Sequence, residues 1–406
     1  MHPIWAVAQT FFREVTRSLG FRLFFPMLLL VGAVLPGVVS GEDLLGRLRL
    51  LVSYGLGIPA VLISLVTLVY STGSLSRDVD RRFVYLVATK PLRPAQILLG
   101  KLLGVVVLDA ALLLSVLLVF SVNVWFLTIG QPVRQQEAAQ QQFFVARLGV
   151  FPGLDETTKV PPGHESALTF RGLPDSRSSG ERLLIRFKIY ASPYETIQVD
   201  TRWRCVGTGG EAVRARRITQ STHHLLEVPS TLVGENGLLT IFLRNDEDAD
   251  SGVHLLVPPE SVEVLFVYGG FAANVGRVAL VLMGHFTFLA VLGLLGAALF
   301  SLATANLLAF LVYIAGTVSG YLKESLRVFD SFGQFGLLVA GVGERFLELV
   351  PDFSGENPLD LLVDGRAIAV SALLAGLGWT LVVRSGVVFL FTAWCWSRRE
   401  VGGRQT

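Results

Sequence analysis

The feature that most constrains this chain is an apolar run that extends almost without interruption from residue 278 to residue 322. A single helix of this length would measure about 65 Å at 1.5 Å per residue, roughly twice the thickness of a bilayer core. The run must therefore fold back on itself, and the polar residues at 301–306 favour a turn there. We expect two membrane-spanning helices from this segment.

Four further apolar runs, at residues 21–39, 50–72, 97–129 and 368–396, are long enough to cross a membrane. A span needs about 20 apolar residues. The whole chain of 406 residues is 52% hydrophobic and only 16% charged, whereas soluble domains are about a quarter charged. These runs predict an α-helical polytopic membrane protein with six transmembrane helices, three in residues 21–130 and three in residues 271–406.

The distribution of charge predicts the orientation of these helices. Cytoplasmic loops are enriched in Lys and Arg. By this rule the basic loop 73–100 and the Arg398-Arg399 tail lie in the cytoplasm, together with residues 1–20, where apolar residues at helical spacing predict an amphipathic interfacial helix. The loop 323–366 is acidic on balance, which fits the outer face.

Residues 131–270 differ from the rest of the chain because they are polar and contain no long apolar run. Short runs of β-branched and apolar residues between turn signals predict strands at 183–190, 196–204, 213–218, 225–228, 238–243 and 262–267. This spacing favours an extracytoplasmic β-sandwich-like domain, inserted between the third and fourth spans. Residues 131–142 are also compatible with a polar helix that leads out of the third span.

The charged segment 74–92 has a pattern of its own. Ser76 is a suitable N-cap for a short helix with Asp78 and Asp80 in its first turn, where carboxylates interact favourably with the helix dipole. Phe83 and Leu86 fall on one apolar stripe of that helix. Pro91 ends it, and the following Pro94 suits the first turn of the next helix. The alternative is an ordinary solvated loop.

This segment resembles the loop between the second and third membrane helices of ABC exporter permeases of the ABC-2 type. The matching positions are Asp78, Asp80, Lys90, Pro91, Leu92, Gln96, Ile97, Leu98, Gly100 and Lys101. Family members often carry Gly-Thr and Ser-Arg where this chain has Arg81-Arg82 and Arg93-Pro94. Residues 300–316 and 349–353 also resemble the family, in its Ser-rich turn and in the step before its last span.

The resemblance implies a permease subunit in a bacterial cytoplasmic membrane, paired as a homodimer or heterodimer. Two separate ABC ATPase subunits would dock on this loop, with coupling residues Asp78, Asp80, Arg81, Arg82, Phe83, Leu86, Lys90 and Pro91. ATP would act only through that partner, because Gly100-Lys101 is followed by Leu102 and no phosphate-binding loop is present in the sequence. We therefore do not expect an enzyme. A membrane receptor or scaffold without transport is the alternative.

Three ionisable residues interrupt the apolar runs: Asp109, His285 and Arg384. Such residues are costly in a bilayer and are candidates for a functional role by default. A vestibule position for Asp109, a neutral hydrogen-bonding role for His285 and snorkelling for Arg384 are the alternatives. The two cysteines suggest neither a disulfide nor a metal site, and a net charge of +2 without a basic field does not suggest a nucleic-acid partner.

Overall fold

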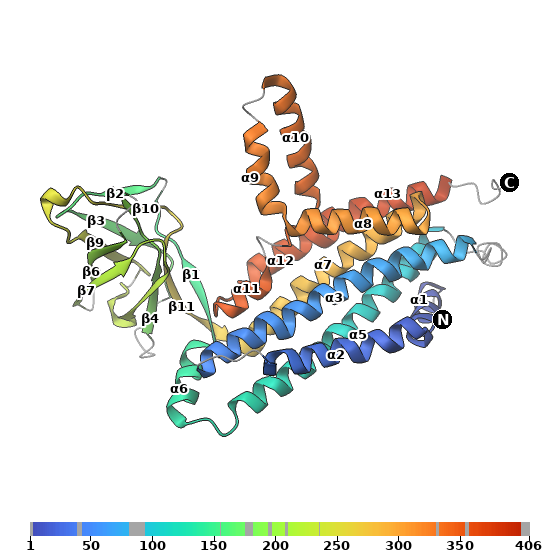
Figure 1. Cartoon of the computed structure of the whole chain (residues 1–406), viewed down its shortest axis with the longest axis horizontal. Helices are drawn as coiled ribbons and strands as arrows, with labels where there is room; N and C mark the ends of the chain where they lie inside the picture. The colour runs from blue at the N-terminus through green and yellow to red at the C-terminus, as the bar shows by residue number, and fades with distance from the viewer. Residues whose placement is uncertain are drawn as a thin grey trace. The chain divides into compact units, whose positions relative to one another are not determined.

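The computed structural model describes residues 3–38, 43–80, 94–154, 156–174, 182–193, 197–207, 210–234, 236–329, 333–353 and 357–398. Figure 1 shows helices and strands in separate parts of the chain. Contacts divide it into two compact units, which we call the helical unit (Met1–Phe144 and Phe271–Thr406) and the β unit (Val145–Gly270).

The first half of the helical unit consists of α1 (Pro3–Arg17), α2 (Leu19–Val38), α3 (Leu44–Asp80) and α5 (Pro94–Thr128). α1 is amphipathic, with Ala8, Phe11 and Val15 buried, and it meets α2 at a bend of 75°. α5 begins at Pro94, as predicted.

The prediction that a short helix begins at Ser76 is wrong for residues 76–80, which are the described part of that segment. α3 continues without a break through Ser76 to Asp80. Leu75 is buried in a cluster with Leu98 of α5 and with Trp396. The sequence pattern contains only the local capping signal of Ser76. Packing against these distant residues outweighs that local preference.

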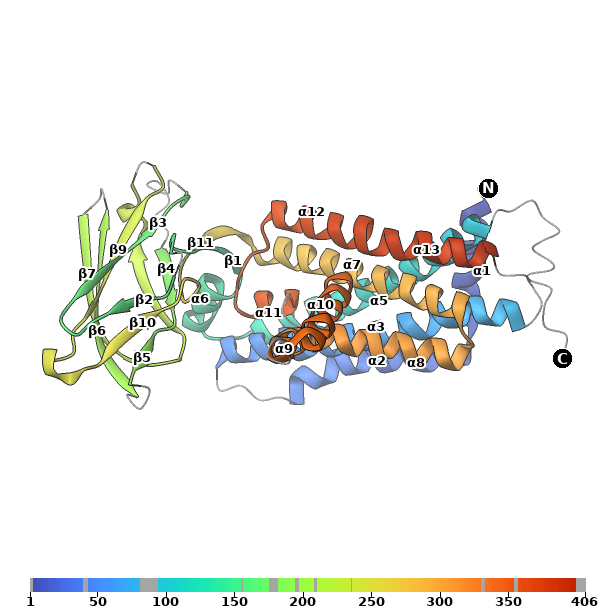
Figure 2. The same ribbon diagram turned by 90° about the horizontal axis from the view of Figure 1, so that it is seen from above.

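The second half contains α6 (Val133–Gln142), α7 (Phe271–Leu299), α8 (Leu302–Thr317), α9 (Ser319–Phe329), α10 (Gly333–Leu349), α11 (Pro358–Val363), α12 (Val370–Gly378), a π-helical segment (Trp379–Arg384) and α13 (Ser385–Arg398). The break between α7 and α8 confirms the predicted fold-back near residue 301. Figure 2 shows α12, the π-helical segment and α13 as one continuous rod.

Four helices of the described residues are long and apolar enough to cross a membrane: Leu44–Arg77, Pro94–Thr128, Phe271–Leu299 and Val370–Arg398. The bent pair α1 and α2 makes a fifth if it counts as one span. α8 is apolar but has 16 residues, about 24 Å at 1.5 Å per residue.

α3 is the central helix of this unit and contacts α2, α5, α7 and α8. Its apolar face is buried at Leu48, Leu51 and Ile63. The buried Asn274 of α7 donates to the Arg366 carbonyl and accepts from the Ile368 amide. The Asn274 side chain thereby holds the segment that leads into α12.

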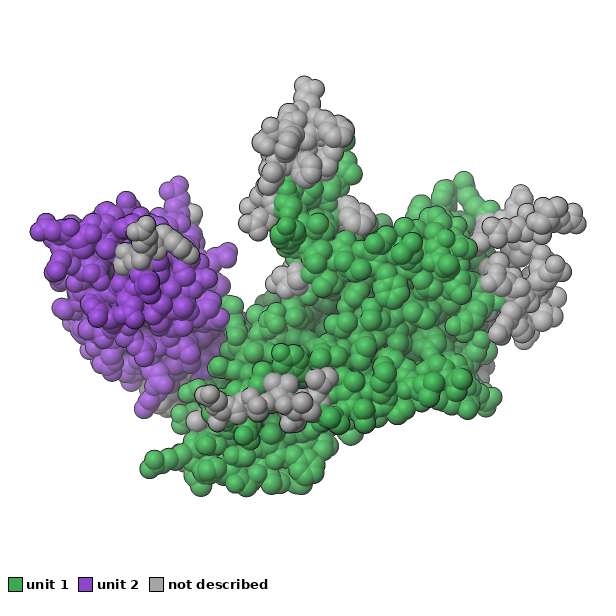
Figure 3. All heavy atoms as spheres, in the orientation of Figure 1, with its two compact units in different colours: residues 1–144, 271–406 green, residues 145–270 purple. Residues whose placement is uncertain are grey.

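The β unit, purple in Figure 3, contains eleven strands in the part of the chain that the structure describes. They are β1 (Val145–Val150), β2 (Thr158–Val160), β3 (Glu165–Phe170), β4 (Arg182–Phe187), β5 (Tyr190–Ser192), β6 (Gln198–Gly207), β7 (Gly210–Thr219), β8 (His224–Pro229), β9 (Leu239–Asn245), β10 (His254–Val257) and β11 (Val262–Gly270). They form antiparallel sheets in the orders β1-β11-β4-β8, β2-β10-β5 and β3-β9-β6-β7.

Alternation along β6 shows why these residues form a two-sided sheet. Val199, Trp203 and Cys205 point into the core, while the arginines between them face outward. The Trp203 ring lies 4.2 Å from the ring of Phe187, on the facing sheet. Each predicted run contains a strand, but β1, β2, β3 and β10 were not predicted, and the run predicted at 183–190 ends at Tyr190, the first residue of a separate strand, β5.

The predicted insert begins at residue 131, whereas the compact unit begins at Val145. α6 belongs to the helical unit because Ala139 and Phe143 are buried in its core. The Phe143 ring lies 4.7 Å from that of Phe271, whose amide donates to the Phe144 carbonyl. β1 and β11 then pair from Val145 and Gly270, so the chain enters and leaves the β unit along adjacent strands.

Candidate functional site

A stripe of buried hydroxyl groups runs along α3 and forms the polar part of the helical unit's interior. Ser64, Thr67, Ser71 and Ser74 are three or four residues apart, which places them on one side of the helix, and the buried Thr72 lies next to Ser71. Thr72 donates to Asn306 Oδ1 of α8 at 2.7 Å. The stripe therefore joins α3 to its neighbours by polar contacts as well as by packing.

Asp109 of α5 is fully buried against this stripe. Thr67 Oγ1 lies 2.8 Å from Asp109 Oδ1 and 2.8 Å from the Ile63 carbonyl oxygen. A threonine hydroxyl has one proton to donate. This proton is shared between the Asp109 carboxyl and the Ile63 carbonyl, and both oxygens act as acceptors. Asp109 Oδ2 has no hydrogen-bond partner among the described residues.

Lys101 is buried near the start of α5 and holds two helices together. Its Nζ donates to the carbonyl oxygen of Ser74 on α3. This bond ties α5 to α3 just before the segment 81–93 that connects them. Lys101, which the family resemblance singled out, therefore has a defined structural role at the foot of both helices.

α1 crosses α5 at two glycines, Gly100 and Gly104. A Cβ on Gly100 would lie 2.6 Å from Val7 Cβ and 2.8 Å from the Ile4 carbonyl oxygen. A Cβ on Gly104 would lie 2.6 Å from Phe11 Cδ1. Small residues four apart allow two helix backbones to approach closely. These positions carry glycine because α1 lies directly on them.

His285 and Arg384 belong to a second polar cluster, around the end of α10. Arg384 Nε donates to the Glu348 carbonyl oxygen at 3.1 Å, one of the last carbonyls of α10. These carbonyls lack partners within the helix and carry partial negative charge, so a guanidinium caps them well. Arg384 ends the π-helical segment, a feature often found at functional sites.

Phe353 joins this cluster to α7 and α8. Its ring lies edge-on to His285 at 5.1 Å and 5.5 Å from the Tyr313 ring, and its amide donates to the Gly316 carbonyl. A Cβ on Gly316 would lie 2.6 Å from the Phe353 ring. Phe353 was not among the predicted site residues, although Pro351 marks the break after α10 and Gly316 leaves room for the Phe353 ring.

The structure thus places the three predicted intramembrane residues in two clusters. His285 and Arg384 share one, together with Asp352, whose charge acts on His285. Asp109 lies in the other, between α3 and α5. Of the predicted coupling residues, Asp78 and Asp80 end α3, and the others, Arg81, Arg82, Phe83, Leu86, Lys90 and Pro91, lie outside the described residues.

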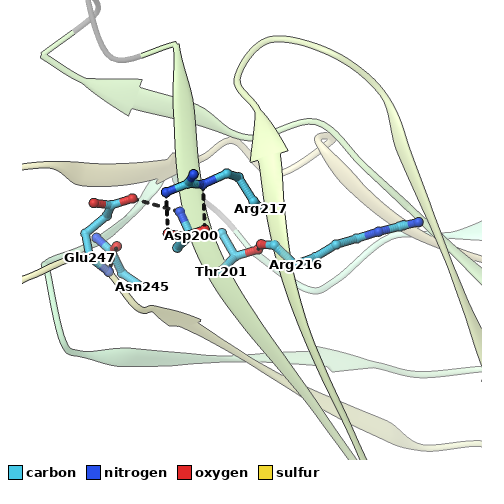
Figure 4. Close-up of polar contacts among 6 residues, drawn as sticks. All are labelled: Asp200, Thr201, Arg216, Arg217, Asn245 and Glu247. Carbon is cyan, nitrogen blue, oxygen red and sulfur yellow. Dashed lines mark hydrogen bonds and ion pairs between the residues drawn. The ribbon is translucent and has the colours of Figure 1, made fainter.

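The β unit carries a separate polar surface. Figure 4 shows Arg217 of β7 reaching Asp200 of β6, with both Nε and Nη2 at 3.0 Å from its carboxylate oxygens. Glu247 accepts from the Asp200 amide, and the buried Asn245 binds main-chain carbonyls of two other segments. These contacts fix the loop after β9 to β6.

Elsewhere on the β unit lies an open cleft of about 340 Å³, lined by Arg182, Arg214, Glu227 and residues 228–231. Near it, burial raises the pKa of the Cys205 thiol to about 11, and Arg214 opposes this only in part. His224 stacks on Phe187 at 5.5 Å. Among the described residues, no group of three His, Cys, Asp or Glu side chains is placed to hold a metal ion.

Comparisons of the chain with family models, with curated proteins and with solved structures find no match in any of the three.

Proposed function

We propose that this chain is the membrane-spanning permease subunit of an ATP-driven exporter of the ABC-2 type. In this proposal the six spans are α2, α3, α5, α7, α8 and the continuous rod from α12 to α13. α8 is the shortest, and α9 and α10 lie at its outer end. Both chain termini are then cytoplasmic, and the β unit is extracytoplasmic.

The observation that carries the proposal is how α3 and α5 are held at the ends that residues 81–93 connect. Lys101 binds the Ser74 carbonyl, and α1 lies across α5 at Gly100 and Gly104. α3 and α5 have 37 and 35 residues and are long enough to cross a membrane. A displacement of the connecting segment would therefore be transmitted along both helices. An ATPase subunit that docks on residues 81–93 could move the spans only if this segment is firmly connected to α3 and α5, as these contacts provide.

In the proposed mechanism, two ATPase subunits bind the connecting segments of two permeases, which are identical or related. An amphipathic helix docks its apolar face in a groove of its partner. ATP binding and hydrolysis would move α3 and α5, and the pair of permeases would open alternately to the two sides of the membrane. The β unit would act on the selection of substrate or partner.

The experiment is purification of the tagged full-length chain from its native membrane, followed by identification of any ATPase that accompanies it. Phe83→Asp with Leu86→Asp should abolish co-purification of that ATPase. Ile197→Asp, an exposed apolar position of the β unit, is the matched control and should leave co-purification unchanged. Absence of any ATPase, or an unchanged yield with the double variant, would favour a receptor or scaffold instead.

A further inference from the structure

The β unit has an open edge where two strands of different sheets meet. β7 is the last strand of one sheet and β8 the last strand of another. Arg216 of β7 donates to the Leu225 carbonyl of β8 and so bridges the two edges. The cleft of about 340 Å³ lies at this edge, with a volume inside the range typical of small-molecule sites.

Arg214 and Arg216 of β7 differ from six other arginines of the β unit in their partners. On other parts of the strands, and at the rim of the cleft, arginines form ion pairs with carboxylates: Arg182, Arg186, Arg202, Arg204, Arg217 and Arg244. The hydrogen bonds of Arg214 and Arg216 go instead to main-chain carbonyls. No carboxylate of the described residues pairs with either guanidinium.

The geometry of β7 directs these two arginines to the cleft side. Successive strand residues point to opposite faces. Arg217 therefore projects toward Asp200 on the outer face, and Figure 4 shows Arg216 projecting the other way. Arg214 is two residues from Arg216 and shares its side of the strand. Arg214, which has no carboxylate partner among the described residues, thus lines the cleft next to the Arg182–Glu227 pair at 2.7 Å, and Arg216 projects from the same side of β7.

We propose that this cleft binds a soluble organic anion that carries a carboxylate or phosphate group. Arg214 is its main cationic contact. Arg182 uses Nη1 for Glu227 and has further guanidinium N–H groups to offer. The Thr231 hydroxyl at the cleft wall supplies a neutral donor. Guanidinium groups suit both carboxylate and phosphate because their planar donors match two oxygens at once. The inference does not depend on the proposed export function.

The test is calorimetric titration of the full-length chain in maltoside detergent with two probes, citrate and inorganic pyrophosphate. We expect saturable binding of at least one probe, weakened by added salt. Arg214→Gln should reduce the affinity by about ten-fold or more, and Arg214→Lys by less, because a single ammonium cannot bind two oxygens in the same way. The response to the two probes identifies the preferred anionic group.

Arg217→Gln is the matched control, because it removes a guanidinium from the same strand but from the opposite face. Its affinity should equal that of the unmodified chain. Arg182→Gln is a second cleft variant that decides the question if Arg214→Gln does not fold, as judged by circular dichroism and melting. The proposal is overturned if neither probe saturates the unmodified chain, or if a folded cleft variant binds as tightly as Arg217→Gln.

Discussion

Replacement of Gly100 by alanine tests whether α1 lies on α5. The added Cβ would lie 2.6 Å from Val7 Cβ and 2.8 Å from the Ile4 carbonyl oxygen. Since favourable carbon contacts lie near 3.5–4.0 Å, Val7 must move by about 1 Å. A β-branched side chain and a helical carbonyl adapt poorly, so α1 itself has to shift.

The magnitude follows from two opposing effects. Overpacking of a close contact costs about 1–3 kcal/mol. Replacement of glycine by alanine inside a helix gains about 1 kcal/mol by itself. Gly376 of α12 has no atom within 4 Å of an added Cβ, so Gly376→Ala shows the gain without the clash. The free energies of unfolding of the two variants should therefore differ by about 1–3 kcal/mol, with Gly100→Ala the less stable.

The assay is reversible unfolding of the full-length chain in mixed micelles. The chain has six tryptophans, so the difference in fluorescence between matched chains with and without Trp5→Phe gives the Trp5 signal, a local reporter of α1. Val7→Gly removes both side-chain atoms that clash, and should recover part of the loss in a double-mutant cycle with Gly100→Ala. Equal stability of Gly100→Ala and Gly376→Ala, with an unchanged Trp5 signal, would refute the close crossing of α1 and α5.

Three further predictions concern the polar and ionisable groups Asp109, Cys205 and Arg384. Asp109→Asn should be tolerated better than Asp109→Leu, and a double-mutant cycle of Asp109→Leu with Thr67→Val should give a coupling free energy of about 0.6–1.7 kcal/mol; zero coupling would contradict the hydrogen bond. Burial raises the pKa of Cys205 from 9.0 to about 11, so the thiol favours the folded state below pH 9 and this contribution is lost as pH rises toward 11. Denaturant titrations across that range should show this loss, and Cys205→Val should remove it; an identical pH dependence in the variant would count against the burial. Arg384→Gln removes the cation from the end of α10, so proteolysis or amide exchange near Glu348 should increase, while exchange in α5 stays unchanged.

Elements with a local signal in the amino-acid sequence could be predicted from that sequence. Apolar runs longer than one bilayer thickness predict membrane-length helices and a fold-back, and α7 and α8 break where the polar residues interrupt the run. The proline at position 94 predicts the start of α5. Short runs of β-branched and apolar residues between turn signals predict six strands of the β unit. The strands β2 and β10 were not predicted because runs of three and four residues are too short to show a strand pattern.

Contacts between residues far apart in the sequence could not be predicted from local patterns. α3 continues past the capping signal at Ser76 because Leu75 packs on α5 and α13. The β unit begins at Val145 and not at residue 131 because Phe143 is buried among the helices. Arg384 lies near the middle of an apolar run in sequence, yet it caps α10, which ends 35 residues earlier at Leu349. Local patterns report secondary-structure preference and the free energy of burial. They carry no information about the partner that a buried polar group finds, since that partner comes from another part of the chain.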